Sequence, residues 1–174
     1  MCAGFDLVVN DISIKSSEIL YQACRFPSYP SLQLDILSES NPMTAKKLAR
    51  KYINLTRSGW DVNRISIMKW VVFTKLCQNW DSFYFLLDST CDNFIVEHSE
   101  KDTFWGARKE GNSLYGVNAL GRILMLTRNT ARVNGKNALS VIQPLNIPQF
   151  NLMGFRIMPV LSTDKPRLAS KQLF

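Results

Sequence analysis

The sequence contains no long apolar run, a single histidine and only four cysteines. None of its apolar runs approaches the ~20 residues that a membrane-spanning helix needs, so no spanning helix is predicted. The first residues also lack a charged stretch followed by an apolar one, which argues against a signal peptide. We therefore expect a cytoplasmic protein without a membrane partner.

The sequence has little material for metal or redox chemistry. Cys2, Cys24, Cys77 and Cys91 form no CxxC pair, and His98 is the only histidine. A zinc site needs several such ligands at suitable spacing. We therefore expect no metal and no cofactor, and reduced thiols, with Cys77 and Cys91 as small core residues.

Acidic residues are scarce near the C-terminal end. Residues 126–174 contain seven Lys or Arg residues and only Asp164, so this segment holds +6 of the net charge of +7. A basic segment beside a nearly neutral body suggests an anionic partner such as nucleic acid. A merely soluble tail explains the same charge equally well.

The remaining patterns favour one compact domain. A hydrophobic content of 46% over 174 residues can bury a single core. Two short β-prone runs flank Asn10 and Asp11 and predict a hairpin, whereas most later segments have helical periodicity. The predicted class is α+β, mostly helical with a small β element. We place the domain at residues 1–135 and a proline-containing, extended C-terminal extension at residues 136–174.

Local signals set the expected boundaries. Ser16 or Ser17 caps a helix that stops before Pro27, and Asn41 followed by Pro42 starts a second helix. The other expected elements are a loop at 27–42, a helix from Asp61 to about 79 with a core stripe of Ile65, Met68, Val72 and Leu76, a short helix at 81–87, a buried strand at 94–96 and a helix from 119 to about 132.

One face of the first helix carries polar and aromatic side chains. Glu18, Tyr21, Gln22 and Arg25 recur at i, i+3, i+4 and i+7, so they share one side of the helix. An amphipathic helix with a solvated face has the same pattern. An aromatic ring and an amide between an acid and a guanidinium also suit the wall of a ligand site.

The stretch from residue 95 to 125 is a second candidate. An apolar run, an acidic turn with Asp102, the aromatic Phe104 and Trp105, and Gly106 lead through a loop to Asn118 at a helix start. Small-molecule pockets are often built this way, with carboxylates for chemistry, aromatics for a flat ligand and helix amides for phosphate. The structural alternative is that Asp102 caps a turn and Trp105 belongs to the core.

The motifs together resemble a known family. They are SSEILYQACRFP at 16–27, NPMTAKK at 41–47, GWDVNRISIMKWVVFTKLCQN at 59–79, IVEHSEKDTFWG at 95–106 and GVNALGRILM at 116–125. Over about residues 1–130 the chain resembles the NADAR, or YbiA-like, family. The YQACRFP and PMTAK forms look closest to members paired with DNA ADP-ribosyltransferase toxins. The chain opens at MCAGF, where the family usually has a preceding segment ending in Ser-Asn. Two explanations stay open: part of one pocket wall lacks its usual residues, or the start of the chain is wrongly assigned.

The resemblance implies a compact, mostly helical α+β domain with one pocket. It also implies hydrolysis of an N-glycosidic bond between ribose and an amino-bearing base. The family's acidic positions fall on Glu18 and Asp102, and its pocket tryptophan falls on Trp60. We assign the two carboxylates as the acid/base pair, without fixing which does which, because glycosidic cleavage needs both charge stabilisation and proton transfer.

Other residues receive supporting roles. Tyr21 and Trp105 are expected to stack on the base, Arg25 to hold a phosphate and the helix start at Asn118 to bind a diphosphate; Gln22, Trp60 and Gly106 complete the predicted substrate site. Lys46 has two interpretations. It is either a surface lysine or a nucleophile that forms a Schiff base with an opened ribose.

Three functions compete at this point. The leading one removes ADP-ribose from guanine in single-stranded DNA and so reverses a cognate transferase toxin. The second cleaves phosphoribosylamino-pyrimidine intermediates of riboflavin synthesis, and the third is a non-catalytic module that binds ADP-ribose or nucleic acid. The C-terminal segment has matching alternatives. It either contacts strand phosphates or packs onto the domain through Val141, Ile142, Leu145, Phe150, Leu152 and Phe155.

Overall fold

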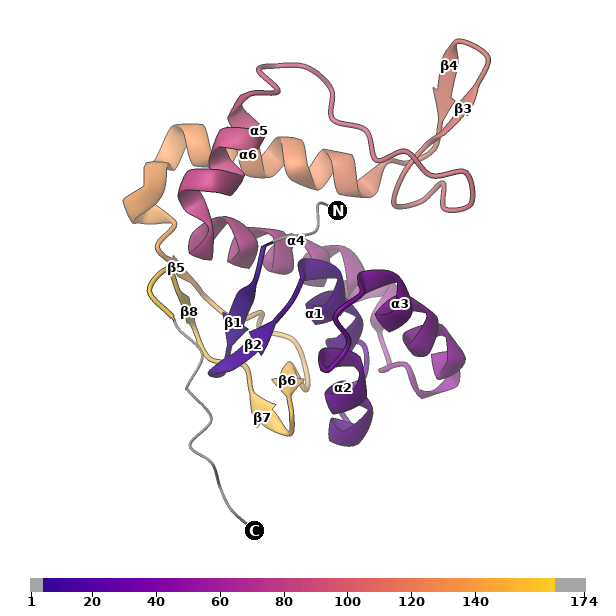
Figure 1. The fold of residues 1–174 in the computed structure, drawn as a ribbon, viewed down its shortest axis with the longest axis vertical. Coiled ribbons are helices and arrows are strands. Elements are labelled where there is room, and N and C mark those ends of the chain that lie inside the picture. The colour runs from indigo at the N-terminus through magenta and orange to yellow at the C-terminus, as the bar shows by residue number, and fades with distance from the viewer. Residues whose placement is uncertain (1–4, 165–174) are drawn as a thin grey trace.

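The structure is a computed structural model that describes residues 5–164. Expectations about Cys2 and about the basic residues beyond position 164 lie outside that range. The elements are β1 (Leu7–Val9), β2 (Ile12–Ile14), α1 (Ser17–Ala23), α2 (Pro30–Leu37), α3 (Pro42–Lys51), η1 (Ile53–Leu55), α4 (Trp60–Gln78), η2 (Trp80–Tyr84), α5 (Phe85–Asp88), β3 (Arg108–Glu110), β4 (Ser113–Tyr115), α6 (Ala119–Ala138), β5 (Val141–Ile142), β6 (Asn151–Leu152), β7 (Phe155–Arg156) and β8 (Val160–Leu161). Helices with small two-stranded sheets confirm the predicted α+β class (Figure 1).

The strands of residues 5–164 form antiparallel pairs, β1 with β2, β3 with β4, β5 with β8 and β6 with β7. The predicted first hairpin is confirmed. Asn10 and Asp11 link its strands with φ angles of 50° and 64°, as a two-residue hairpin turn of type I′ requires. The β3–β4 hairpin is different, because all of its strand residues are exposed and it projects from the helical body (Figure 1).

The helix starts follow local chemistry. The Ser16 side chain caps α1 by accepting a hydrogen bond from the amide of Ile19 at 3.3 Å. Asn41 caps α3 in the same way, with Pro42 at the first helical position. Both starts are confirmed. The expected start of α4 is one residue off, because Gly59 in a left-handed conformation (φ 67°) precedes the helix and Asp61 lies in its first turn.

One helix and two single residues differ from the expectations. Residues 27–42 were predicted as a loop, yet α2 forms there, because Pro30 occupies the helix start, where its fixed φ is favourable. Ile65 is 45% exposed, because the buried residues of α4 are Trp60 at its start and then a set that begins at Ile67. Cys91 is exposed and does not belong to the core, whereas Cys77 is buried as expected.

The prediction of a buried strand at 94–96 is also wrong. This segment has no strand partner in the structure, and Phe94 is 87% exposed. Its backbone is instead held by one side chain. The Asn118 amide donates to the Ile95 carbonyl at 2.9 Å, and the Asn118 oxygen accepts from the Glu97 amide at 3.0 Å. Asn118 thus satisfies two backbone polar groups of this segment without a sheet.

The described part of the C-terminal segment packs onto the domain. Phe150 and Leu152 are buried, and the Phe150 ring meets Trp70 of α4 edge-on with centroids 4.9 Å apart. Of the other residues named for packing, Ile142 and Leu145 contact the core, whereas Val141 and Phe155 are exposed. The domain boundary at residue 135 stays a prediction.

Two glutamine side chains fasten this segment. Gln33 of α2 is fully buried, donates to the carbonyls of Ala23 and Asn151 at 3.0 and 3.1 Å, and accepts from the Met153 amide at 2.7 Å. Gln78 exchanges two hydrogen bonds of 2.8 Å with Val8 in β1 and also donates to the Leu161 carbonyl at 3.3 Å. Losing either side chain would leave buried backbone groups without partners.

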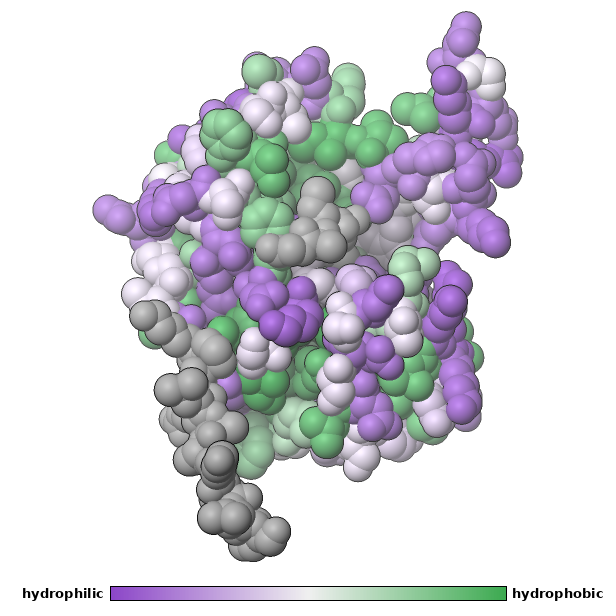
Figure 2. Space-filling model, viewed as in Figure 1, coloured by the Kyte–Doolittle hydropathy of each residue, from purple (hydrophilic) through white to green (hydrophobic). Residues whose placement is uncertain are grey.

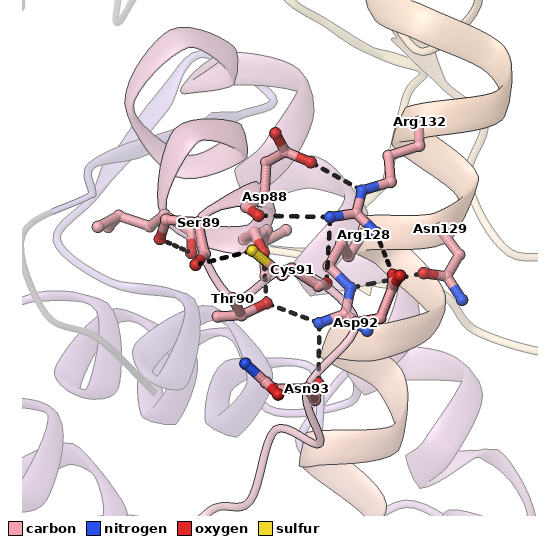
Figure 3. A network of polar contacts seen from close by, with 11 residues as sticks. Asp88, Ser89, Thr90, Cys91, Asp92, Asn93, Arg128, Asn129 and Arg132 are labelled. Carbon is pink, nitrogen blue, oxygen red and sulfur yellow. Dashed lines mark hydrogen bonds and ion pairs between the residues drawn. The ribbon is translucent and has the colours of Figure 1, made fainter.

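A polar network joins the turn after α5 to α6 (Figure 3). Arg132 pairs with Asp88 and Asp92, both at 2.7 Å. The nearly buried Arg128 donates to the Thr90 hydroxyl at 2.6 Å and to the Asn93 carbonyl at 3.0 Å. The network anchors the beginning of the loop that leads to residues 95–106.

Candidate active site

One cavity of about 430 Å³ collects most of the predicted site residues. Its walls come from α1, α3, the first half of α4, the 97–106 loop and the start of α6. The predicted residues that line it are Glu18, Tyr21, Gln22, Arg25, Lys46, Trp60, Asp102, Trp105 and Gly106. Among the predicted site residues only Asn118 does not line it. The roles assigned to these residues stay predictions.

The α1 wall follows directly from helix periodicity. Glu18, Tyr21, Gln22 and Arg25 all face the cavity, as their spacing predicts. Gln22 donates its amide to a Glu18 carboxylate oxygen at 2.8 Å, which fixes the orientation of that half-buried acid. Arg25 donates to the Thr56 hydroxyl at 2.8 Å, and burial lowers the pKa of its guanidinium.

The aromatic side chains form a packed cluster rather than a set of open faces. The Tyr21 ring lies 5.1 Å from the Trp60 ring and 5.6 Å from the Trp105 ring. Tyr21 is 4% exposed and Trp60 is 8% exposed. Burial, assisted by the Glu18 carboxylate, raises the pKa of Tyr21 far above its usual value, so its hydroxyl stays protonated. Trp105 is half-buried and therefore has more ring surface available to a ligand.

Asp102 combines the two roles that the sequence left open. Its Oδ1 accepts a hydrogen bond from the Trp105 amide at 3.0 Å, which is a turn cap. Its Oδ2 lies 3.9 Å from Lys46 Nζ inside the cavity. One oxygen of the same carboxylate therefore holds the turn and the other faces the site.

Gly106 matters for close packing at the cavity wall. A side-chain carbon at this position would lie 2.3 Å from the Glu97 carbonyl oxygen, so only glycine fits. The Ala107 amide donates to that same carbonyl at 2.8 Å. This contact places Glu97, His98 and Ser99 along the cavity.

The diphosphate role expected for the helix start at Asn118 is not supported. The amides of Asn118, Ala119 and Leu120 donate to carbonyls of the 104–106 loop at 3.0 to 3.1 Å. The Asn118 side chain already forms hydrogen bonds with the backbone of residues 95 and 97. The start of α6 thus serves to bind the loop that carries Asp102 and Trp105.

Several lining residues were not predicted. They are Met43, Arg50, Arg64, Met68, Glu97, His98, Ser99 and Leu120. Arg50 lies one turn beyond Lys46 on α3, so helix periodicity contains the signal for it. Arg64 has the same signal, because it lies one turn beyond Trp60 on α4, and its guanidinium lies 3.8 Å over the ring of Phe104, a residue from a distant loop.

The cavity lining carries more positive than negative side chains. The described lining includes the cations Arg25, Lys46, Arg50 and Arg64. The acids in the same lining are Glu18, Glu97 and Asp102. Carboxylates for proton transfer thus share the cavity with groups that bind phosphate.

The basic charge of residues 126–174 is partly neutralised within the chain. Arg132 pairs with Asp88 and Asp92, and Lys136 pairs with Asp81 at 2.8 Å. Among residues 5–164, no three His, Cys, Asp or Glu side chains lie close enough together to hold a metal ion. No helix in the same range is long and apolar enough to cross a membrane.

Comparison with known proteins gives the chain a family. A riboflavin biosynthesis protein of Vibrio vulnificus (strain YJ016) is 34% identical over 145 residues, which are 80% of this chain and 38% of that protein. The chain therefore spans well under half of that relative. An N-glycosidase of Nostoc punctiforme is 31% identical over 126 residues, 71% of this chain and 78% of that protein.

A solved structure and a family model agree with these relatives. The NMR structure of the Escherichia coli protein YbiA superposes with a TM-score of 0.63 and 26% identity, covering 74% of this chain and 73% of that chain. The family model described as the NADAR domain matches residues 4–132. That range contains every residue lining the cavity, and the chain belongs to the NADAR domain family.

Proposed function

We propose that the chain is an N-glycosidase that hydrolyses the bond between ribose and an amino-bearing base. The observation that carries the proposal is the meeting of Glu18, from α1, with Asp102, from a distant loop, in one cavity lined by aromatic rings. Glycosidic cleavage uses two such carboxylates. The names of the Nostoc punctiforme and Escherichia coli relatives, both called N-glycosidases, support the same reaction.

We propose ADP-ribosylated guanine as the substrate and reversal of a transferase toxin as the role. The charge of the cavity supports this choice. Arg25, Lys46, Arg50 and Arg64 supply four cations, which suits the two phosphates of ADP-ribose better than a single phosphate. The alternative substrate is a phosphoribosylamino-pyrimidine, which the names of the Vibrio vulnificus and Zea mays riboflavin proteins favour.

In the two-carboxylate route, one acid protonates the departing amino nitrogen while the C1–N bond breaks. The other stabilises the oxocarbenium-like state and removes a proton from the water that adds to C1. Gln22 holds the Glu18 carboxylate in place. The Trp105 amide holds Asp102 by one oxygen and leaves the second toward the cavity.

Lys46 provides a second route at the same place. Its Nζ is 3.9 Å from Asp102 Oδ2, which is beyond direct hydrogen-bond reach, so Asp102 would take a proton from the amine through one bridging water. The neutral amine would then displace the base at C1, and the base would leave with a proton. The resulting ribosylamine would open by breaking its C1–ring-oxygen bond to give an imine, which water would hydrolyse to release the ribose and the amine. Both routes use Asp102 as the proton-transfer group.

The test measures release of ADP-ribose from a single-stranded oligonucleotide carrying ADP-ribosylated guanine, and of the base from a phosphoribosylamino-pyrimidine. Glu18→Gln should lose cleavage, whereas Glu39→Gln, the same change outside the cavity, should retain it. Faster cleavage of the pyrimidine would favour the alternative substrate. Tight binding of ADP-ribose without cleavage of either substrate would instead identify a binding module.

A further inference from the structure

Helix α3 has an unusual charge for a helix beside a cavity. Pro42–Lys51 contains four basic residues and no acidic one. Ala45 and Ala49 are fully buried and fix the inward side of the helix. The basic residues therefore lie on the sides that face the cavity and the solvent.

The four cations form two neighbouring stripes. Lys46 and Arg50, one turn apart, line the cavity. Lys47 and Lys51, also one turn apart, are exposed and lie outside it. Positive charge thus continues from the cavity across its rim onto the outer surface, where Figure 2 shows hydrophilic side chains below the projecting β3–β4 hairpin.

These cations are less neutralised than those of α6. Within residues 5–164, Lys47 and Arg50 form no ion pair, and Lys51 lies 5.4 Å above the Tyr52 ring. Arg132 and Lys136 of α6, in contrast, pair with acids at 2.7 and 2.8 Å. Compared with α6, α3 therefore carries more positive charge that is free to bind an anionic partner, and it lies beside the cavity.

We propose that Lys47 and Lys51 bind the phosphate backbone of a single nucleic-acid strand whose modified base occupies the cavity. The inference rests on the proposed function. Lysines that contact phosphates add affinity without reading sequence. A single strand fits better than a duplex, because a base must leave the stack to enter a cavity. A membrane fits poorly, because the outward side of α3 has only Met43 as a large apolar residue.

The test compares Lys47→Gln/Lys51→Gln with a control of equal charge change, Lys69→Gln/Arg156→Gln. The two control side chains are exposed, lie outside the cavity lining and form no ion pair within residues 5–164. Each protein is assayed on a single-stranded oligonucleotide with one ADP-ribosylated guanine and on free ADP-ribosylated guanosine. Two lost phosphate contacts should flatten the slope of log KM against log salt by roughly 1.4. Raising salt from 50 to 200 mM should then cost the wild type about sevenfold more in KM than the α3 variant. The turnover of free ADP-ribosylated guanosine should be the same in the α3 variant as in the wild type.

Binding of the unmodified oligonucleotide, followed by fluorescence anisotropy, tests the surface independently of catalysis. Weaker binding of the α3 variant alone, at an unchanged melting temperature, would support the proposal. The proposal would be overturned if the wild type and the α3 variant had equal slopes of log KM against log salt. It would also be overturned if the control variant lost as much oligonucleotide binding as the α3 variant. The proposal would also be overturned if the α3 variant lost binding to phosphatidylserine vesicles but bound the oligonucleotide as the wild type does. Absence of cleavage in every protein would count against the proposed function, while the anisotropy data would still decide the role of α3.

Discussion

Asp102 allows catalysis and structure to be separated by two substitutions at one position. Asp102→Asn keeps an oxygen that can accept the Trp105 amide hydrogen bond of 3.0 Å, but removes the charge that faces Lys46. Asp102→Ala removes both. If the carboxylate transfers a proton during cleavage, both variants should lose about 10²-fold or more in kcat.

The stability effects of the two variants should differ. A hydrogen bond to a charged acceptor contributes roughly 1.5–3 kcal/mol when it is buried, and this turn is only partly buried, so about 1–2 kcal/mol is expected for the alanine variant. In a domain of this size that change lowers the melting temperature by roughly 2–8 °C. The asparagine variant should melt close to the wild type.

The assay is chromatographic release of ADP-ribose from ADP-ribosylated guanosine, with melting followed by scanning fluorimetry on the same samples. A folded Asp102→Asn protein that keeps its turnover would show that Asp102 is a turn cap and no more. Equal destabilisation by both substitutions would show that the carboxylate charge, rather than the hydrogen bond, stabilises the loop.

The other predictions use the same protein. Glu18→Gln should abolish cleavage without lowering the melting temperature, and an active variant would exclude this acid from the mechanism. Borohydride added during turnover should link Lys46 covalently to the ribosyl product if an imine forms; an unlinked wild type together with an active Lys46→Ala variant would leave only the two-carboxylate route. Deleting residues 139–174 removes four buried apolar side chains, whose burial stabilises the fold by roughly 6–12 kcal/mol. This loss is comparable with the whole stability of a domain, so circular dichroism should show an unfolded chain. A folded, active truncation would contradict this packing. Burial raises the pKa of the Cys24 thiol to about 12. Peptide mapping after brief iodoacetamide treatment at pH 8 should therefore find the exposed Cys91 modified well before Cys24. Faster labelling of Cys24 would refute the assigned burial.

The parts of the site that were predictable depend on local rules. A capping serine and the 3.6-residue repeat are enough to place Glu18, Tyr21, Gln22 and Arg25 on one helix side, and the structure shows them in one cavity. Arg50 follows from the same rule applied to α3. For these residues the sequence specifies the geometry almost completely, because neighbours on a helix stay neighbours in any fold.

The parts that were not predictable depend on contacts between distant segments. The apolar run at 94–96 looks like a strand, but a strand needs a partner and the sequence does not name one. Asn118 supplies the hydrogen bonds instead. Glu97 reaches the cavity through a backbone contact at Gly106. Arg64 follows from its helical spacing to Trp60, but its guanidinium also makes a ring contact with Phe104. Neither contact follows from any sequence period.

Charge is the clearest case in which composition and structure differ. The excess of basic residues after position 126 predicts an anionic partner for the C-terminal segment. In the structure, Arg132 and Lys136 instead pair with acids that lie 40 to 55 residues earlier in the chain. A paired cation attracts a polyanion less than a free one, since its neighbour already neutralises it. The distribution that matters is therefore the unpaired charge near the cavity. By that measure α3 is better suited than α6 to the proposed binding of a phosphate backbone beside the catalytic acids. Only one of its side chains forms an ion pair within residues 5–164, and that pair is 3.9 Å long.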